Sequence, residues 1–346
     1  MKWTIYPVSK FEQHAVSWDA LNECGPNSPL LSSRFVLPSL RAFQSGKERL
    51  AVSGNPDHPD AMCILKQRRN LIWDTFQPAQ APVGFWLMRP GLDLETAITG
   101  LMRALPGFPL VVGITQQDPW LIPRPPNSAK MLTLNYIDTA RILLDGDYET
   151  YWDSRSKNLR QNMRKARNKL EKDGLAFQLK CISDPAEIKG AIENYGVMES
   201  TGWKATDGTA VQSNNIQGKF YTDLLETFCR AGCGRIYYLT FNDTIVAMDL
   251  CIHQGSTLVI LKTTYDENYK DYSPAMLMHQ ELFRTLFQAG DFQRIEFYGK
   301  VMDWHLRWTE EIRTMYHVNV CRWERIMNMM RQRIGAENMK WDEKMP

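Results

Sequence analysis

Hydrophobic residues recur along this chain at two spacings, and these spacings predict a mixture of strands and helices. Alternation with a period of two is typical of a strand, whereas apolar residues three and four positions apart are typical of a helix. In the first half, residues 3–8 alternate and residues 11–24 have helical spacing. A helix is predicted at 94–105 and a buried strand at 109–114, before a Pro-rich loop at 119–128.

The second half shows helices and strands in a similar order. A helix is predicted at 153–174, with Ser154 or Ser156 as its N-cap and Gly174 as its end. Three antiparallel strands, joined by short turns, are predicted at 234–241, 244–253 and 257–265. The whole pattern predicts an α/β (α+β) fold in which sheets are flanked by helices.

The composition is that of a globular protein large enough for two domains. The chain has 346 residues and a net charge of +2, which does not favour nucleic-acid binding over the whole surface. It has no run of 18 apolar residues and no signal-peptide pattern at its start, so we expect a cytoplasmic protein without a transmembrane segment. Seven scattered Cys predict reduced thiols. The Cys229–Cys233 pair lacks the further ligands of a zinc site, so no metal is expected.

One helix is strongly basic. Residues 155–172 hold eight Lys and Arg against a single acid, Glu171. Such a run is most often a solvated face, and it can also bind the phosphates of a cofactor or an anionic acceptor. It has no interleaved aromatic residues, so stacking on nucleic-acid bases is not expected.

A strand–turn–helix segment is the main candidate for ligand binding. The strand at 257–265 runs into a polar loop, and Ser273 and Pro274 precede a helix at 275–290. The N-terminus of a helix has unpaired N–H groups and a partial positive charge, so it can bind phosphate. The competing interpretation is that Ser-Pro only caps the helix.

Several segments in order resemble one family. WKATDGTA at 203–210, LKTTYDENYKDYSPAMLM at 261–278 and IEFYGKVMDWHLRW at 295–308 resemble the GNAT superfamily of acyl-CoA N-acyltransferases. Within it they resemble the CelD/BcsL branch, which is named for cellulose and exopolysaccharide biosynthesis. The resemblance runs from about residue 154 to residue 309. It implies two GNAT-like domains, each with a mixed, mainly antiparallel sheet flanked by helices: a degenerate domain at 1–148 and an acyltransferase domain at 149–346.

The resemblance implies direct acyl transfer from acyl-CoA, or from an acyl carrier protein, to an amine. The acceptor would be an amino sugar, an amino acid or another small metabolite. Trp203 and Lys204 are expected to contact the acceptor or the donor. The residues expected to bind the donor are Thr263, Thr264, Tyr265, Tyr272, Ser273, Pro274, Ala275, Met276 and Leu277. Two positions depart from the branch: Ala275 stands where Gly is usual, and Trp304-His305 stands where Tyr-Lys is usual.

Four residues are candidates for catalysis, because attack on a thioester requires a neutral amine and therefore a base. Asp249 lies in a central strand, where a carboxylate is costly unless it is paired or functional. Glu296 lies on the strand beside the expected cofactor cleft, and Tyr298 beyond it can protonate the departing thiolate. His305 has the near-neutral pKa of a base. For each of these residues a purely structural role, such as an ion pair or a place in the core, is the alternative.

Two other functions stay open from the sequence. One is a bridge-type aminoacyltransferase that uses aminoacyl-tRNA, in which the basic helix would serve the tRNA. The other is a protein without catalysis that binds polyanions or acts as an assembly subunit, for which the departures at Ala275 and His305 argue. The acceptor, the acyl length and the oligomeric state are left open.

Overall fold

The computed structural model describes residues 1–200, 211–212 and 215–342. The chain forms two compact units. The first contains Met1–Leu37, Phe43–Ile137 and Thr314–Pro346, and the second contains Pro38–Ala42 and Asp138–Arg313. The units therefore differ from the continuous segments 1–148 and 149–346, because the last strand of the chain returns to the first unit. There β13 (Ile312–Cys321) pairs antiparallel with β6 (Val111–Gln117).

The first unit is built on a sheet with the strand order β1-β2-β3-β4-β6-β13, and β5 pairs with β3. Of these pairs, only β4 with β6 is parallel. The remaining bounds are β1 (Trp3–Pro7), β2 (Arg49–Asn55), β3 (His58–Arg69), β4 (Ile72–Thr75), β5 (Trp86–Met88), α1 (Ala15–Cys24), α2 (Ser33–Phe43), α3 (Leu94–Ala104) and α10 (Glu324–Asp342). Of α2, residues 38–42 belong to the second unit.

In the first unit, side-chain hydrogen bonds start helix α3 and tie it to the sheet. The helix predicted at 11–24 is a 3-10 turn (Val8–His14) followed by α1. Helix α3 begins where the Asp93 side chain accepts a hydrogen bond from the Thr96 N–H at 2.7 Å. Its Ala97 carbonyl accepts from the buried Trp3 indole at 3.0 Å, which ties α3 to β1.

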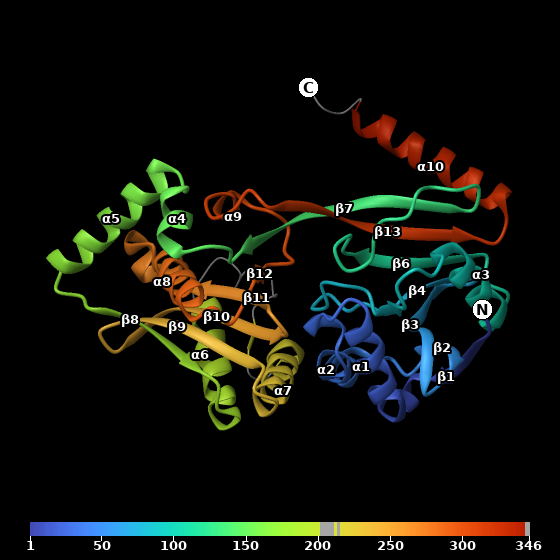
Figure 1. The fold of residues 1–346 in the computed structure, drawn as a ribbon, viewed down its shortest axis with the longest axis horizontal. Coiled ribbons are helices and arrows are strands. Elements are labelled where there is room, and N and C mark those ends of the chain that lie inside the picture. The colour runs from blue at the N-terminus through green and yellow to red at the C-terminus, as the bar shows by residue number, and fades with distance from the viewer. Residues whose placement is uncertain (201–210, 213–214, 343–346) are drawn as a thin grey trace. The chain divides into compact units, whose positions relative to one another are not determined.

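The second unit has the strand order β7-β12-β11-β10-β9-β8. Of its pairs, only β11 with β12 is parallel. Helices α4, α5 and α8 cover one face of this sheet, and α6 and α7 cover the other (Figure 1). The bounds are β7 (Met131–Leu143), β8 (Phe177–Ile182), β9 (Gly234–Phe241), β10 (Thr244–Gln254), β11 (Thr257–Tyr265), β12 (Arg294–Glu296), α4 (Tyr148–Asp153), α5 (Lys157–Lys172), α6 (Ile188–Ser200), α7 (Ile216–Arg230), α8 (Pro274–Ala289) and α9 (Asp303–Leu306).

The basic helix α5 forms as its sequence predicts. The Ser156 hydroxyl accepts from the Leu159 N–H and caps the first turn. Gly174, with φ +68°, follows the last turn. The apolar stripe is buried against the core of the unit, which leaves the basic residues on the outer face; it consists of Leu159, Met163, Ala166 and Leu170.

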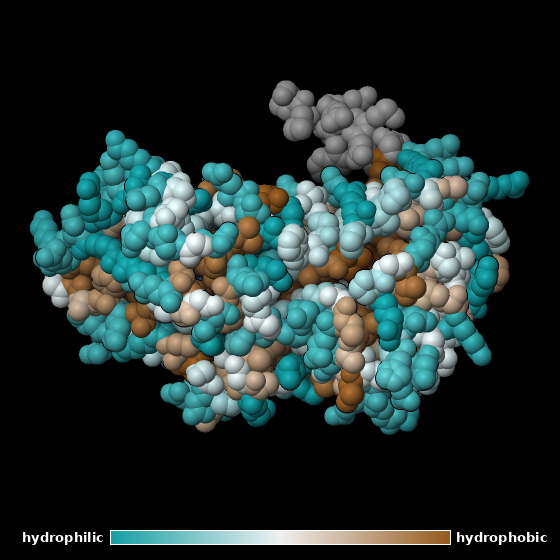
Figure 2. Space-filling view, viewed as in Figure 1, coloured by the Kyte–Doolittle hydropathy of each residue, from teal (hydrophilic) through white to brown (hydrophobic). Residues whose placement is uncertain are grey.

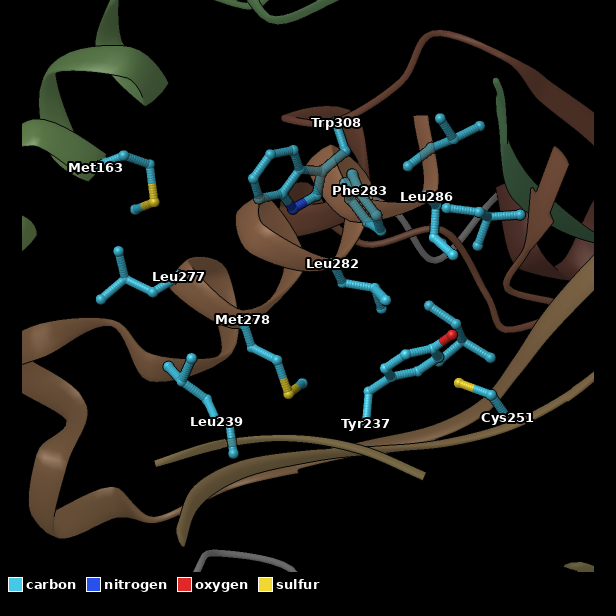
Figure 3. Packing of buried hydrophobic residues seen from close by; sticks show 14 of the residues in the cluster. Met163, Tyr237, Leu239, Cys251, Leu277, Met278, Leu282, Phe283, Leu286 and Trp308 are labelled. Atoms are coloured by element: carbon cyan, nitrogen blue, oxygen red, sulfur yellow. The ribbon is translucent and has the colours of Figure 1, made fainter. Parts of the chain in front are cut away.

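Helix α8 is anchored on the sheet by its apolar face. Met278 and Leu282 lie over Leu239 and Tyr237 of β9, with Phe283 nearby (Figure 3). Full burial of each such side chain contributes on the order of 1.5–3 kcal/mol, so the position of the helix is well determined. Within the described residues, no helix is both long and apolar enough to span a bilayer.

Candidate functional site

A cavity lies in the second unit where β11 and β12 separate. The two strands pair only at residues 257–259 and 294–296. Beyond this pairing a cavity of about 630 Å³ lies between β11, the turn before α8, and the segment from Phe297 into α9. This volume is within the usual range for small-molecule sites. The lining residues are Ile260, Leu261, Lys262, Thr263, Tyr265, Lys270, Ser273, Pro274, Ala275, Met276, His279, Phe297, Gly299, Lys300, Met302, Trp304 and His305.

A β-bulge shapes the β11 side of the cavity. Lys262 lies opposite Leu250, but Ile260 lies opposite Cys251, so Leu261 has no opposite residue on β10. A bulge bends the strand and redirects its backbone groups. On its other side β11 pairs with β12 only as far as residue 259, and within the described residues no other strand continues this pairing. Residues 260–263 of β11 line the cavity.

The turn before α8 presents donors for an anion. Ser273 has φ +53° and ψ +52°, a left-handed conformation that is uncommon for a residue other than Gly. Its side chain makes no capping hydrogen bond. Among the described residues, nothing accepts from the N–H groups of Ala275 and Met276, and both residues line the cavity. Lys270 and Lys300 line the same space, so the turn is suited to negative charge.

Asp249 lies behind the cavity wall with both carboxylate oxygens bonded. It is completely buried in β10. Its Oδ1 accepts from the Thr263 hydroxyl at 2.6 Å, and its Oδ2 lies 3.0 Å from Nε2 of His279. Thr263 and His279 both line the cavity. Asp249 therefore reaches the cavity through these two side chains.

His279 is the residue that the sequence analysis missed. It is 1% exposed, and its ring stacks with those of Phe283, at 5.4 Å between ring centroids, and Trp304, at 5.5 Å. Its Nδ1 is buried and has no hydrogen-bond partner among the described residues. The signal in the sequence is the position of a His one turn after Ala275 and one turn before Phe283, on the apolar stripe of a predicted helix.

His305 lies in the cavity wall as a neutral ring. It is 4% exposed, and the nearest ring is that of Trp304, with a centroid distance of 3.6 Å. Burial, together with the neighbouring His279, lowers the pKa of His305 to about 4. Its Nδ1 accepts from the Met302 N–H at 3.0 Å, so the neutral ring carries its proton on Nε2. Nε2 of His305 therefore donates a hydrogen bond. The catalytic base that we expected from the sequence would instead need a lone pair on this nitrogen to accept a proton.

Glu296 and Tyr298 lie outside the cavity wall. Glu296 is 2% exposed and accepts from the Arg313 guanidinium at 2.7 Å. The same guanidinium lies 5.4 Å from the centroid of the Tyr298 ring. The wall is formed instead by Phe297 and Gly299. Neighbouring residues of an extended segment point to opposite sides, which explains why Glu296 faces away from Phe297.

Most of the expected donor-binding residues line the cavity, namely Thr263, Tyr265, Ser273, Pro274, Ala275 and Met276. Three do not. Thr264 points to the other side of β11, Tyr272 donates its hydroxyl to Asp173 at 2.8 Å, and Leu277 is buried in the core under α8. The expected acceptor residues Trp203 and Lys204 lie outside the described residues.

A second groove, of about 550 Å³, runs along α5. Arg160 pairs with Asp153 at 2.8 Å, and Arg167 pairs with Glu281 and with the Gln280 amide oxygen. The surface over α5 is predominantly hydrophilic (Figure 2). The residues that line the groove are Trp152, Lys157, Arg160, Gln161, Met163, Arg164, Arg167, Asn168 and Gln280.

Metal binding has no visible site in the described part of the chain. There, no group of three or more His, Cys, Asp or Glu side chains is arranged to hold an ion. Cys229, in the CxxxC pair, is buried, and burial raises the pKa of its thiol to about 11.

Residues 157–306 match the sequence profile of the family described as acetyltransferase (GNAT) domain. This span lies within the region of resemblance at 154–309. No curated protein sequence matches the chain. The comparison confirms the resemblance at the level of the GNAT domain, and it does not distinguish the CelD/BcsL branch.

Solved structures with the same fold cover both units. FemX has 10% identity and a TM-score of 0.57, over 93% of this chain and 98% of that one. The C-terminal domain of a protein described as a "putative lysylphosphatidylglycerol synthetase" from Agrobacterium fabrum has 11% identity and a TM-score of 0.56, over 90% and 92%. L-PGS from Bacillus licheniformis has 14% identity and a TM-score of 0.54, over 91% and 93%. The expected mixed fold with a mainly antiparallel sheet flanked by helices is confirmed, and the matched domain has the GNAT-type acyltransferase fold.

Proposed function

We propose that the second unit transfers an acyl group from acyl-CoA to the amine of an amino sugar, an amino acid or another small metabolite. The observation that carries this proposal is that one cavity joins the opening between β11 and β12 to the N-terminus of α8. The opening suits an extended thioester arm, and the turn suits the pyrophosphate of CoA. An acyl carrier protein is the alternative donor, because it presents the same thioester arm.

The donor would be held mainly by backbone and by lysine. The N–H groups of Ala275 and Met276 point from the first turn of a 16-residue helix, where the helix dipole favours an anion. Lys270 and Lys300 add positive charge beside them. Ala275 has a methyl group where the branch usually has Gly, and this group borders the same turn.

The chemistry requires removal of a proton from the acceptor. At pH 7, an amine with a pKa of about 10.4 is neutral in roughly one molecule in 2,500. The neutral amine attacks the thioester carbonyl, the C–N bond forms, the C–S bond breaks, and the thiolate takes up a proton. Asp249 supports the removal of the amine proton through the side chains that it holds in the wall, and the Nε2–H of His305 is placed to donate a hydrogen bond. Glu296 we assign to the ion pair with Arg313.

Calorimetric titration with acetyl-CoA, a long-chain acyl-CoA and acetyl-pantetheine tests the donor site. We expect both CoA thioesters to bind more tightly than acetyl-pantetheine, which has no pyrophosphate. Lys270→Glu should weaken acetyl-CoA binding at least about tenfold, because it reverses a positive charge beside the pyrophosphate. Ala275→Trp should have an effect of the same size, because the indole ring would occupy the space in front of the turn. Lys219→Glu is the matched control, since Lys219 is an exposed lysine on α7 outside the cavity. If no CoA thioester binds at millimolar concentration, the proposal is wrong.

A panel of amines tests the transfer itself. Release of free thiol from acetyl-CoA is followed with glucosamine, lysine, glycine and ethanolamine as acceptors. We expect at least one amine to accelerate thiol release and to yield an amide that mass spectrometry detects. Donor binding without any amide would favour the alternative of a protein that has lost catalysis.

The basic groove favours a second candidate function, in which the acyl donor is an aminoacyl-tRNA. Lys157 and Arg164 line this groove without an ion pair in the described part of the chain. Under this alternative, tRNA binding weakens steeply with salt, and Arg164→Glu weakens it much more than Lys189→Glu on the exposed face of α6. If wild type, Arg164→Glu and Lys189→Glu all bind tRNA equally weakly, an aminoacyl-tRNA donor is excluded.

A further inference from the structure

We propose that His279 is the catalytic base of this reaction and that Asp249 holds it in the required tautomer. The inference rests on the proposed function and gives it a specific proton acceptor. Neither the family match nor the resemblance of the motifs assigns a role to His279, which stands apart from the donor turn on the next turn of α8.

The hydrogen bonds of Asp249 determine where the His279 ring carries its proton. A carboxylate in the middle of a sheet is strongly destabilising unless donors surround it. The two donors are the Thr263 hydroxyl on Oδ1 and the His279 Nε2–H on Oδ2. An ionised carboxylate can only accept hydrogen bonds, so the ring proton lies on Nε2 and Nδ1 is left with a lone pair.

In the part of the chain that the structure describes, the lone pair of His279 Nδ1 has no hydrogen-bond partner, although the atom is buried. A buried polar atom without a hydrogen bond costs about 1–3 kcal/mol. Several buried side-chain atoms of the described residues lack a partner, and among them the Nδ1 atom of His279 is the one that belongs to a residue lining the cavity. The ring lines the cavity in which we place the thioester. An acceptor amine that enters this cavity would supply the missing donor, which explains why the protein keeps Nδ1 unpaired.

The surroundings of His279 can stabilise the cation that forms when Nδ1 takes a proton. The Asp249 carboxylate lies beside Nε2, and the rings of Phe283 and Trp304 both stack with the imidazole. Aromatic faces attract a cation. His305, on α9, is a neighbouring titratable ring, and its lowered pKa keeps it neutral, so it adds no repulsion. Tyr195 faces Asp249 and stays protonated, because burial raises its pKa.

The proton transfers balance over one cycle. As the amine nitrogen bonds to the carbonyl carbon, its proton passes to Nδ1 of His279. When the C–S bond breaks, the electron pair leaves with sulfur, and the proton on Nδ1 passes to the thiolate. The products are an amide and a free thiol, and His279 returns to its starting tautomer.

The first test is His279→Gln, measured with acetyl-CoA and the best amine of the panel. The Gln side-chain amide can still donate to Asp249, but it has no basic nitrogen. We expect kcat to fall by about 10²–10⁴-fold, the usual contribution of general base catalysis, while the Kd for acetyl-CoA changes by less than about threefold. His253→Gln on the same sheet is the control, because His253 bonds to the Gly232 carbonyl outside the cavity. Unchanged kcat in His279→Gln overturns the inference.

The second test asks whether Asp249 positions the proton of His279 or only packs in the core. In Asp249→Asn the amide NH₂ would donate to Nε2, which forces the His279 proton onto Nδ1 and removes the base. We expect kcat to fall by about 10²-fold or more with little change in KM for acetyl-CoA. ¹⁵N NMR of labelled histidine should show the proton on Nε2 in the wild-type protein and on Nδ1 in the variant. A wild-type ring with its proton on Nδ1 overturns the inference.

The two proposals fail in distinguishable ways. If acetyl-CoA binds and an amine is acylated, but His279→Gln is as fast as wild type, the base is elsewhere and the proposed function stands. If no amine is acylated, the proposed function falls, and the NMR measurement alone decides the His279–Asp249 pair. In that case an Nε2 proton that moves to Nδ1 in Asp249→Asn supports the pair, and any other pattern rejects it.

Discussion

At the scale of single residues, burial decides the charge of His305. Its pKa is lowered to about 4, against about 6.5 for an unfolded chain. Between these values the unfolded state binds more protons, so the stabilising effect is fully present above pH 6.5 and is lost as the pH falls towards 4. Between pH 7.5 and pH 4.5, the free energy of unfolding in urea should fall in both proteins. We expect the fall to be up to about 3 kcal/mol smaller in His305→Gln than in wild type. His58→Gln, at an exposed site, should behave as wild type; equal losses in all three proteins would contradict this assignment.

Ser273 shows a second single-residue effect, through its backbone. Its left-handed conformation is unfavourable for a branched side chain and neutral for Gly. We expect Ser273→Val to lower the free energy of unfolding by about 1–3 kcal/mol and Ser273→Gly to change it by less than about 1 kcal/mol. Chemical denaturation measures both. A Val variant as stable as the Gly variant would show that this turn relaxes to another conformation.

Site residues that are positioned by neighbouring sequence could be predicted, whereas those positioned by distant parts of the chain could not. The turn at Ser273–Pro274 could be predicted, because its strand, loop and helix are consecutive in the chain. The partner of Asp249 could not, since His279 is 30 residues away and its ring meets the carboxylate only when α8 packs on β10. Glu296 is a candidate base from its place on the strand beside the expected cofactor cleft, but its neighbour Phe297 lines the cavity. A strand pattern alone does not say which face of the strand borders a cavity.

At the scale of elements, the end of the β11–β12 pairing makes a prediction for hydrogen exchange. Within the described part of the chain, the amides of Ile260, Leu261 and Thr263 have a neighbouring strand on one side only. If the donor lies in this opening, acetyl-CoA should slow exchange at these amides. Strand β9 is paired on both sides, with β8 and β10, and should not change. Equal protection of β9 and β11 would indicate general stabilisation in place of binding at this position.

Elements with their own end signals were predicted best. Helix α5 has a serine cap, a buried stripe and a terminal glycine within one short segment, and all three are confirmed. The strand β12 is only three residues long, and α9 only four, because the chain leaves the sheet where the cavity begins. Such short elements are set by tertiary contacts, so periodicity cannot delimit them.

At the scale of the whole molecule, the first unit depends on the return of the chain. Strand β13 contributes buried Tyr316, Val318 and Val320 to the core of that unit. Removal of residues 314–346 should therefore unfold the first unit, which limited proteolysis detects. Removal of residues 324–346 alone keeps β13 and should be milder. Acetyl-CoA should still stabilise the second unit against unfolding in both truncated proteins. At a concentration of 100 times Kd, the free energy of unfolding should rise by about 2.7 kcal/mol.

The bulged, half-paired edge of β11 also bears on inhibitor chemistry. Among the described residues, the pairing of β11 with β12 ends at residue 259. A strand edge of this kind favours an elongated molecule with amide groups at regular intervals, because such a molecule can continue the hydrogen-bond ladder. Flat aromatic compounds fill volume but leave those backbone groups without partners. If the donor lies in this opening, we expect linear, amide-bearing compounds that end in a phosphate or a sulfonate to inhibit this protein more selectively than flat aromatic compounds of the same size.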